Sequence, residues 1–316
     1  MIRAHILVLN YNGEDLLGET IPTLLSACSK SSYPCRLSVI DNESGDNSLA
    51  ILRELFPSVE VISMPNRVLC SYNEVATRLP EEVLIFLNND LKVDANFIDP
   101  LVRPFESRPD LFLVAPKVLD YEGTRMTGGP STLWMSAGLV KSALNEQAAG
   151  AKEQRATFAA GSAGAYDRKK FLELRGYDPI FLPGTVEDMD LCYRAWEKGF
   201  YCLYEPRSVV YHKGQASFHE RFGARGTSAV NARNIYLFMW KNFDSPRLWI
   251  EHFFFLLPRF LWSTLRGQTY WTSGFFKALG KRAEVADARD KRKLEKPSRT
   301  DVEILKLFRR SVAHGA

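Results

Sequence analysis

The sequence predicts an α/β fold with a mostly parallel central sheet, helices on both faces and a C-terminal helical extension. Apolar runs typical of buried strands alternate with segments of helical spacing through about the first 90 residues. Three of these runs end in polar residues, which would meet at one edge of a parallel sheet. An apolar content of 46% is enough for a sizeable core.

Four strands and three helices are expected in alternation. The expected strands are His5–Tyr11, Arg36–Ile40, Val59–Met64 and Leu84–Leu87. Helical spacing or capping residues predict helices near 15–28, 44–55 and 70–79. Such alternation implies parallel pairing through right-handed crossovers. No GxGxxG follows the first strand and no GxxxxGK[ST] occurs, which disfavours dinucleotide and P-loop folds.

The elements expected after residue 90 are less regular. A helix is expected over 94–105 and a strand over 112–118. Residues 121–156 are rich in small and polar residues without a clear period, so we interpret them as a long, mobile loop or insertion. The remaining expected elements are short strands at 157–161 and 208–211 and helices at 187–199, 228–242 and 248–265.

Composition and charge exclude several classes of protein. The net charge is +4, and residues 281–316 hold eleven Lys and Arg against six Asp and Glu. The rest is near neutral, so no nucleic-acid partner is expected. Five scattered cysteines without a CxxC pair disfavour a zinc site or disulfide framework and indicate a reducing compartment. The N-terminal apolar run is too short for a signal peptide, so we expect a cytoplasmic protein.

The polar strand ends form the first candidate site. They are Asn10 with Tyr11, Asp41, and the triplet Asn88, Asn89 and Asp90. At a shared sheet edge they would form a nucleotide-sized polar crevice. A carboxylate there is a hard oxygen ligand suited to Mg²⁺ or Mn²⁺ carrying a phosphate. An ordinary turn after the strand explains the same triplet.

A second candidate group lies between residues 187 and 212. Glu187, Asp188 and Asp190 open the expected helix at 187–199. Repulsion among them would raise at least one pKa, as a catalytic base requires, although acids in a first helical turn also stabilise the helix dipole. His212 follows a short strand, where a structural or exposed histidine is the alternative to a metal ligand.

Six motifs occur in one order over about residues 5–242. They are VLNYNG (8–13), VIDNESGDNS (39–48), FLNND (86–90), GTVEDMDLCYRAWEKGF (184–200), YHKGQAS (211–217) and ARNIYLFMWKN (232–242). On these motifs the chain resembles the family 2 glycosyltransferases, which have the GT-A fold. It is most similar to the non-processive, rhamnosyltransferase-like enzymes of cell-surface polysaccharide assembly.

The resemblance implies a role for each candidate residue. Asn10, Tyr11 and Asp41 would contact the base and ribose of a nucleotide sugar. Asn88, Asn89 and Asp90 would occupy the family's DxD position, with Asp90 as the metal ligand. Asp188, in the pair with Glu187, would be the base that deprotonates the acceptor hydroxyl. His212 would complete the metal coordination.

The implied reaction is metal-dependent, inverting hexosyl transfer. A divalent cation (Mg²⁺ or Mn²⁺) would neutralise the departing diphosphate. A carboxylate would activate a hydroxyl of a saccharide or lipid-linked acceptor on the opposite face of the sugar. The alternatives are a sugar nucleotidyltransferase, which lacks its expected Gly-rich phosphate loop here, and a non-catalytic nucleotide-sugar-binding module.

Two features depart from the family pattern. Asn88 stands where the first aspartate of DxD is usual, so an amide would contact the ribose or a metal-bound water. Residues 66–73 lack the usual glycine of a donor-binding loop. Arg67, in this loop, would pair with a donor phosphate or remain a solvated surface arginine.

The expected domains are a catalytic domain over 1–242, with a nucleotide-sugar half to about 120 and an acceptor half beyond it, and a C-terminal region over 243–316. Residues 248–265 are intensely apolar and aromatic, but Glu251, Pro258 and Arg259 argue against a spanning helix. The helix would pack on the core or lie in a membrane interface. Lys281–Arg299 would face anionic lipid or be a solvated, charge-rich helix. We therefore expect peripheral association with the inner face of the plasma membrane.

Overall fold

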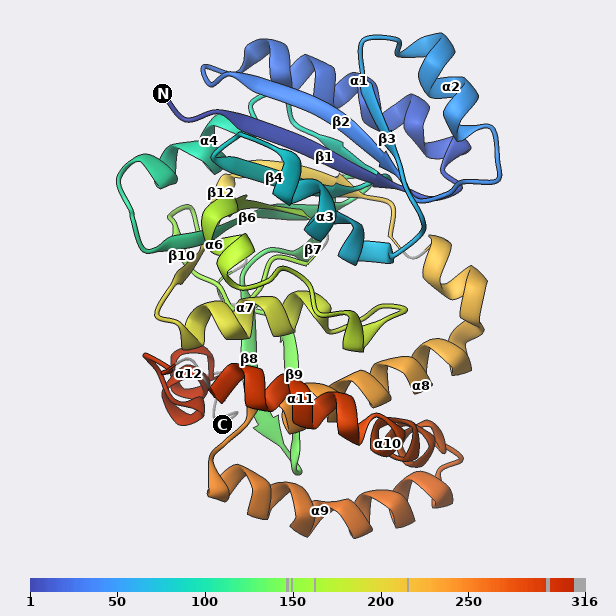
Figure 1. Cartoon of the computed structure of the whole chain (residues 1–316), viewed down its shortest axis with the longest axis vertical. Coiled ribbons are helices and arrows are strands. Elements are labelled where there is room, and N and C mark those ends of the chain that lie inside the picture. The colour runs from blue at the N-terminus through green and yellow to red at the C-terminus, as the bar shows by residue number, and fades with distance from the viewer. Residues whose placement is uncertain (146–147, 149, 162, 215, 294–295, 310–316) are drawn as a thin grey trace. The chain divides into compact units, whose positions relative to one another are not determined.

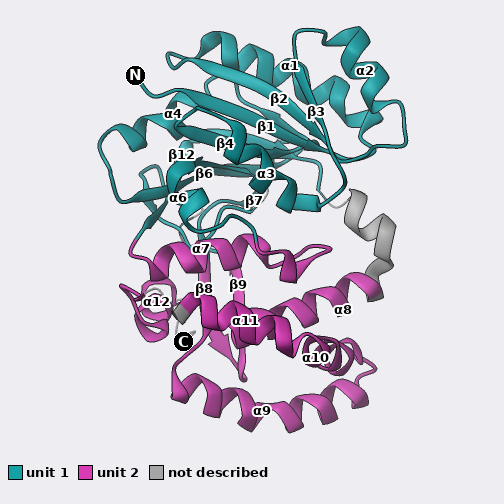
Figure 2. Ribbon diagram, viewed as in Figure 1, with its two compact units in different colours: residues 1–131, 144–177, 200–214 teal, residues 132–143, 178–199, 215–316 magenta. Residues whose placement is uncertain are grey.

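The computed structural model of the chain describes residues 1–145, 148, 150–161, 163–214, 216–293 and 296–309 (Figure 1). The chain forms two compact units (Figure 2). Unit 1 comprises residues 1–131, 144–177 and 200–214, and unit 2 comprises residues 132–143, 178–199 and 215–316. The expected domain boundary after residue 242 stays a prediction.

Unit 1 contains the central sheet and the helices that cover it. Its strands are β1 (Ala4–Asn10), β2 (Cys35–Asp41), β3 (Glu60–Ser63), β4 (Val83–Asn88), β5 (Leu91–Val93), β6 (Leu111–Asp120), β7 (Met126–Gly128), β10 (Arg155–Ala156), β11 (Ala163–Asp167) and β12 (Tyr201–His212). Its helices are α1 (Glu14–Lys30), α2 (Ser48–Leu55), η1 (Val68–Cys70), α3 (Ser71–Arg78), α4 (Ile98–Val102), η2 (Arg103–Glu106) and α6 (Arg168–Glu173). The alternation predicted for the first 90 residues is confirmed.

The sheet has a parallel half and a mixed half. Its order is β10-β12-β6-β11-β4-β1-β2-β3, with β5 beside β12 and β7 beside β6. Strands β1, β2, β3 and β4 pair in parallel, and β6 pairs in parallel with β12. Strand β11 runs antiparallel between β4 and β6. The parallel half aligns the carboxyl ends of β1, β2 and β4, where the candidate nucleotide residues lie.

Helices pack on both faces of the sheet. On one face, Leu17 and Ile21 of α1 and Leu101 of α4 join the buried side chains of β1, β2 and β4 in one apolar cluster. On the other face, Phe86 of β4 stacks on Tyr72 of α3 at a ring-centroid distance of 4.1 Å. Aromatic pairs of this kind stabilise a core beyond the area that they bury. The predicted α/β class is therefore confirmed.

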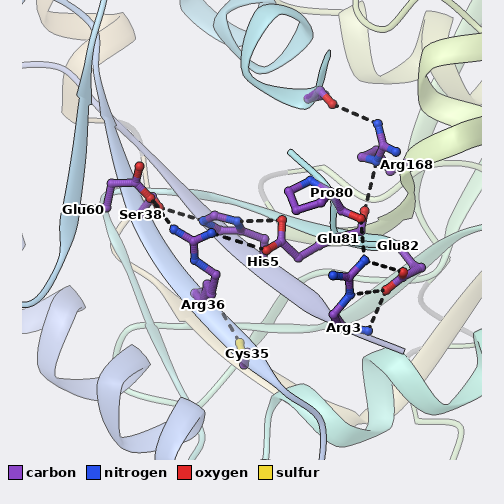
Figure 3. A network of polar contacts seen from close by, with 11 residues as sticks. Arg3, His5, Cys35, Arg36, Ser38, Glu60, Pro80, Glu81, Glu82 and Arg168 are labelled. Atoms are coloured by element: carbon purple, nitrogen blue, oxygen red, sulfur yellow. Dashed lines mark hydrogen bonds and ion pairs between the residues drawn. The ribbon is translucent and has the colours of Figure 1, made fainter. Parts of the chain in front are cut away.

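A buried polar network lies near the amino ends of these strands, away from their polar carboxyl ends (Figure 3). The His5 ring contacts Glu81 through Nδ1 at 3.2 Å and Ser38 through Nε2 at 2.7 Å. Burial lowers the pKa of His5, which the hydrogen bond with Glu81 opposes. The Ser38 hydroxyl in turn donates to Glu60, the first residue of β3, at 2.9 Å. The network joins β1, β2 and the segment before β4.

Unit 2 is mostly helical. Its elements are β8 (Ser131–Ser136), β9 (Leu139–Leu144), η3 (Pro179–Phe181), α7 (Glu187–Glu197), α8 (Ala216–Asn242), α9 (Pro246–Leu265), α10 (Tyr270–Gly280), α11 (Arg282–Lys293) and α12 (Asp301–Phe308). The first residue of β8 and the last residue of β9 are counted in unit 1. Within the described residues, no helix combines the length and apolar character that crossing a bilayer requires.

Several expectations after residue 90 were wrong. Residues 121–156 contain β7, β8, β9 and β10 instead of a long loop. Strand β10 ends at Ala156, and 157–161 is not a strand. The helix expected over 94–105 is split between α4 and η2, because Pro104 lacks a backbone N–H. The strand expected at 208–211 is β12, which is much longer.

The hairpin of β8 and β9 was missed because its turn sequence is unusual. Ala137 and Gly138 connect the strands with φ of 47° and 72°. Two residues at positive φ are typical of a type I′ turn, which Asn-Gly usually forms. His252 of α9 contacts the Gly138 carbonyl oxygen through Nδ1 at 2.8 Å, so α9 covers the hairpin tip.

Two arginines of the C-terminal basic stretch make contacts within unit 2. Arg289 donates to the carbonyl oxygens of Trp240 and Phe243 at 2.7 and 2.8 Å. Arg292 pairs with Glu197 of α7 and with Asp244. These arginines attach α11 to α7 and α8. They are therefore neither solvated nor directed at lipid, the two alternatives that the sequence suggested.

Candidate functional site

The first part of the site lies where β1 and β2 end. Asn10 and Asp41 are register partners at the carboxyl ends of the two strands, and both are buried. The Asn10 amide donates to Asp41 Oδ1 at 3.1 Å and to Ser44 Oγ at 3.2 Å. Asp41 Oδ2 also accepts from the Ser44 backbone N–H at 3.1 Å. The predicted pair is thus brought together, and Tyr11 follows it with an exposed side chain.

Asn89 connects β4 to this pair. Its amide donates to Asn10 Oδ1 at 2.7 Å, and its backbone carbonyl accepts from Thr20 of α1 at 2.7 Å. A Cβ at Gly13 would collide with both the Asn10 and Asn89 side chains, so this turn requires glycine. Asn89 therefore holds β1, β4 and α1 together, whereas Asn88 is the half-buried last residue of β4.

The second part of the site pairs Asp90 with His212. Strand β5 follows Asp90 directly and runs antiparallel to β12, with Leu91 opposite His212. The Lys213 N–H donates to the Asp90 carbonyl at 3.1 Å, which continues the ladder. The His212 Nε2 atom then lies 3.1 Å from Asp90 Oδ2. Two residues far apart in the sequence meet because β5 pairs with β12.

The other carboxylate oxygen of Asp90 has the character of a metal ligand. Asp90 Oδ1 is buried and has no hydrogen-bond partner among the residues that the structure describes. An unpaired buried carboxylate oxygen is costly unless a cation or a donor satisfies it. Carboxylate and imidazole are ligands that Mn²⁺ accepts. Within the described residues, no group of three or more His, Cys, Asp or Glu side chains is arranged to hold a metal ion. The pair would hold such a cation together with further oxygen ligands.

The segment 66–73 contacts the same sheet edge through Asn42. The Asn42 amide donates to the Val68 carbonyl at 3.2 Å, and its oxygen accepts from Ser71 Oγ at 2.6 Å. Val68 has φ of 51°, a strained value for a β-branched residue. Arg67 is largely exposed and lies 3.9 Å from Glu74, which agrees with a surface arginine. The segment is anchored at this edge without the glycine usual in the family.

The acidic group at the start of α7 lies in unit 2. Glu187 is buried, and within the described part of the chain its Oε2 atom has no hydrogen-bond partner. Burial, reinforced by the negative charge of Asp188, raises the pKa of Glu187 to about 8. Glu187 is therefore mostly protonated near pH 7. Asp188 beside it is half-buried.

Asp190 has a different environment. It is fully buried, and it accepts from Lys241 Nζ at 2.8 Å, from Arg194 Nε at 2.8 Å and from the Asn242 amide at 2.8 Å. Burial alone would raise its pKa, but the charges of Lys241 and Arg194 lower the pKa of Asp190 to about 2. Asp190 stays ionised and ties α7 to the end of α8.

The backbone before α7 is strained and held by α8. Gly184, Thr185 and Val186 have φ of 151°, 70° and 72°, unfavourable for the two β-branched residues. The Asn234 amide of α8 donates to the carbonyl oxygens of Phe181, Gly184 and Thr185 at 2.7, 2.6 and 2.8 Å. Strain of this kind persists only where surrounding contacts impose it. Asn234 therefore fixes the backbone that leads into Glu187.

Comparison with known proteins decides the family. The profile described as "Glycosyl transferase family 2" matches residues 5–175, more than half of the chain. The chain belongs to glycosyl transferase family 2. The match spans the sheet edge with Asn10, Asp41 and Asp90. It ends before α7, so Asp188 lies outside it.

Three known proteins are similar to the chain. A Drosophila melanogaster protein named "Putative polypeptide N-acetylgalactosaminyltransferase 10" is 22% identical over 226 residues, 67% of this chain. The chain spans only 34% of that protein's length. A crystal structure of GalNAc-T7 with UDP, GalNAc and Mn²⁺ has a TM-score of 0.58 at 20% identity, covering 78% of this chain and 49% of that one. It supports the predicted GT-A fold.

The third is the mannosyltransferase PcManGT from Pyrobaculum calidifontis, in complex with GDP-Man and Mn²⁺. It covers 92% of this chain and 79% of its own, with a TM-score of 0.49 and 13% identity. The closer resemblance to rhamnosyltransferase-like enzymes stays a prediction.

Sequence reasoning missed several supporting residues in the two units. Asn42, Ser44 and Asn234 lie inside the recognised motifs but were given no role. Each makes side-chain hydrogen bonds with a segment distant in the sequence. Their only sequence signal was an amide or hydroxyl beside a candidate residue or inside an apolar helix, which is too common to be specific.

Proposed function

We propose that this family 2 protein is an inverting glycosyltransferase that uses a nucleoside-diphosphate sugar. The observation that carries the proposal is the Asp90 carboxylate, whose buried Oδ1 has no partner and whose Oδ2 faces His212. Asp90 directly follows Asn89, whose amide donates to Asn10 at the carboxyl edge of the parallel strands. An edge with a cation-binding carboxylate and a polar crevice suits a nucleoside diphosphate.

Each residue has a proposed part in donor binding. Asp90 and His212 would hold Mg²⁺ or Mn²⁺, which when bound neutralises negative charge on the diphosphate. Asp41 and Tyr11 would contact the nucleoside. Because the amides of Asn10 and Asn89 are already committed to buried partners, we assign both to positioning and Asn88 to the direct contact with donor or water.

The surroundings of the two neighbouring acids favour Asp188 as the base. A general base needs an ionised carboxylate at the working pH. Glu187, with its pKa raised to about 8, is mostly protonated near neutrality, and the Asp190 oxygens are taken by Lys241, Arg194 and Asn242. Asp188 would accept the proton of the acceptor hydroxyl while the oxygen attacks the anomeric carbon. Protonated Glu187 would donate a hydrogen bond nearby.

Direct attack by the acceptor displaces the nucleoside diphosphate in one step and inverts the anomeric centre. The proposed acceptor is a hydroxyl of a saccharide or lipid-linked saccharide in cell-surface polysaccharide synthesis. We propose a cytoplasmic protein that works at the inner face of the plasma membrane.

A panel of UDP-, GDP- and dTDP-sugars with Mn²⁺ tests the function. Hydrolysis or transfer of one donor is expected, and NMR of a transfer product reports the anomeric configuration. Pyrophosphate exchange would instead indicate a nucleotidyltransferase. Tight donor binding without turnover would indicate a non-catalytic module.

Manganese binding tests the proposed ligands separately. Asp90→Asn removes the charged oxygen at almost unchanged volume and should weaken Mn²⁺ binding at least about tenfold. Electron paramagnetic resonance of free Mn²⁺ measures the affinity without any substrate. Asp94→Asn, an exposed aspartate four residues away, is the matched control. Equal affinity in wild type and Asp90→Asn would contradict the assignment.

A further inference from the structure

Helix α9 directs apolar side chains to solvent. Ile250, Phe253, Phe254, Leu257, Leu261 and Leu265 are between 59% and 84% exposed. Each lies three or four residues from another of the six, which puts them on one face of the helix. We call these six residues the α9 face. Single exposed apolar residues are ordinary, but a continuous apolar helix face indicates a binding surface.

The opposite side of α9 carries polar groups and is buried. His252 is buried between the Gly138 carbonyl, at 2.8 Å, and the Trp240 indole N–H, at 3.2 Å. Ser263 is buried, and Arg259 donates to the Ala137 carbonyl. A surface helix of a water-soluble protein normally has the reverse arrangement. The polar contacts fix the rotation of α9, so the apolar face is not a consequence of a loosely attached helix.

Positive charge accompanies the α9 face. Helices α9 and α10 carry three Arg or Lys and a single acidic residue, Glu251, and Arg266 directly follows α9. Arg247 and Lys277 are exposed, and the exposed guanidinium of Arg266 lies 4.2 Å from the ring centroid of the exposed Trp262. Tryptophan and arginine are the residues that helices place at the depth of lipid headgroups.

We propose that the α9 face docks onto an anionic lipid bilayer, with α9 lying in the plane of the interface. The six apolar side chains would enter the acyl boundary while Arg247, Arg266 and Lys277 meet anionic headgroups. A second copy of the chain fits less well, because a two-fold contact would place identical basic side chains against each other. The proposal stands on unit 2 alone and does not depend on glycosyl transfer.

Vesicle co-sedimentation of the full chain tests the docking. Wild type should bind phosphatidylcholine vesicles that contain phosphatidylglycerol, bind pure phosphatidylcholine weakly, and lose affinity as salt rises. Leu257→Glu and Phe254→Glu each put a carboxylate on the α9 face, and each should lower the partition constant at least about tenfold. Leu55→Glu, at an equally exposed position in unit 1, should bind as wild type does.

The variants also separate the possible failures. Because the substituted side chains are exposed, the variants should fold, which thermal unfolding checks. The rate of donor hydrolysis by these variants in detergent-free buffer should match that of wild type. Loss of membrane docking can therefore be distinguished from loss of the proposed transferase activity. Wild type that stays in the supernatant, or α9 variants that sediment like wild type, would overturn the proposal. So would a vesicle-free dimer that Leu257→Glu converts to a monomer, because the face would then join two copies.

Discussion

Glu187 and Asp188 are adjacent in sequence but differ in burial. The Glu187 carboxyl is enclosed, with its Oε2 atom unpaired and its pKa raised to about 8. Asp188 is half-buried on the same turn of α7. Neighbouring acids in different surroundings often divide the acid and base roles of a reaction.

The Asp188→Asn variant replaces one carboxylate oxygen by an amide group and so tests the assignment of Asp188 as the general base. Asparagine keeps the shape but accepts no proton, so turnover should fall at least about a hundredfold while donor affinity stays unchanged. Steady-state kinetics and isothermal titration with the donor measure the two effects. Asp15→Asn, at an exposed position of α1, serves as control. Near-wild-type turnover would refute the base assignment.

The raised pKa of Glu187 predicts a pH-dependent stability. A carboxyl with a folded-state pKa near 8 and an ordinary value of 4.5 binds more protons when folded between these pH values. Stability therefore decreases as pH rises from about 4.5 to 8. Glu187→Gln cannot ionise, so it should be more stable than wild type at pH 9, by about 1 to 3 kcal/mol, and this advantage should vanish near pH 5.

Urea unfolding at several pH values measures this difference. Glu54→Gln, at an exposed position of α2, should follow the wild-type curve. If the Glu187→Gln and wild-type stabilities run parallel from pH 5 to pH 9, the buried carboxyl is not protonated in the folded protein.

At the scale of elements, the contact between α8 and the segment before α7 has the clearest energetic consequence. Asn234 donates to three backbone carbonyls around a strained turn. Asn234→Asp preserves volume but replaces the donor with a carboxylate facing those carbonyls. We expect a loss of about 2 to 4 kcal/mol and a fall in kcat, because the turn leads into the proposed catalytic pair.

The exposed Asn231 lies on the same helix and provides a matched control. Asn231→Asp introduces the same charge without touching the turn, so its unfolding curve should match wild type. If both variants were destabilised to the same extent, the added charge on α8, and not the loss of the Asn234 hydrogen bonds, would explain the effect.

At the scale of the whole molecule, the parallel half of the sheet could be predicted and the rest only in part. Strands β1 and β4 are largely apolar runs, and helices separate all four strands from β1 to β4, a pattern that has few alternative folds. Strand β5 has three residues and β7 also three, too few for a period to be recognised. The β8–β9 hairpin has half-exposed strands, so its alternation is weak.

The candidate site likewise contains contacts that could be predicted from the sequence and contacts that could not. Asn10 and Asp41 follow predicted strands, so their proximity could be inferred from parallel pairing. Asp90 and His212 meet only because β5 pairs with β12, and the spacing along the chain contains no sign of it. Their pairing was expected from the family resemblance alone. The roles of Arg289 and Arg292 were missed because a helix rich in charge gives no signal of which charges are paired.

The ladder between β5 and β12 means that a cation at Asp90 and His212 would fasten a short strand to a long one. A three-residue strand opens easily, and its amides exchange with solvent whenever it does. Binding to the closed form alone suppresses that opening by mass action. Mn²⁺ should therefore slow deuterium uptake over Leu91–Val93 and the facing residues of β12 and leave β2 and β3 unaffected. The Asp90→Asn variant should show no such protection, so local exchange rates report the metal site even without a sugar donor.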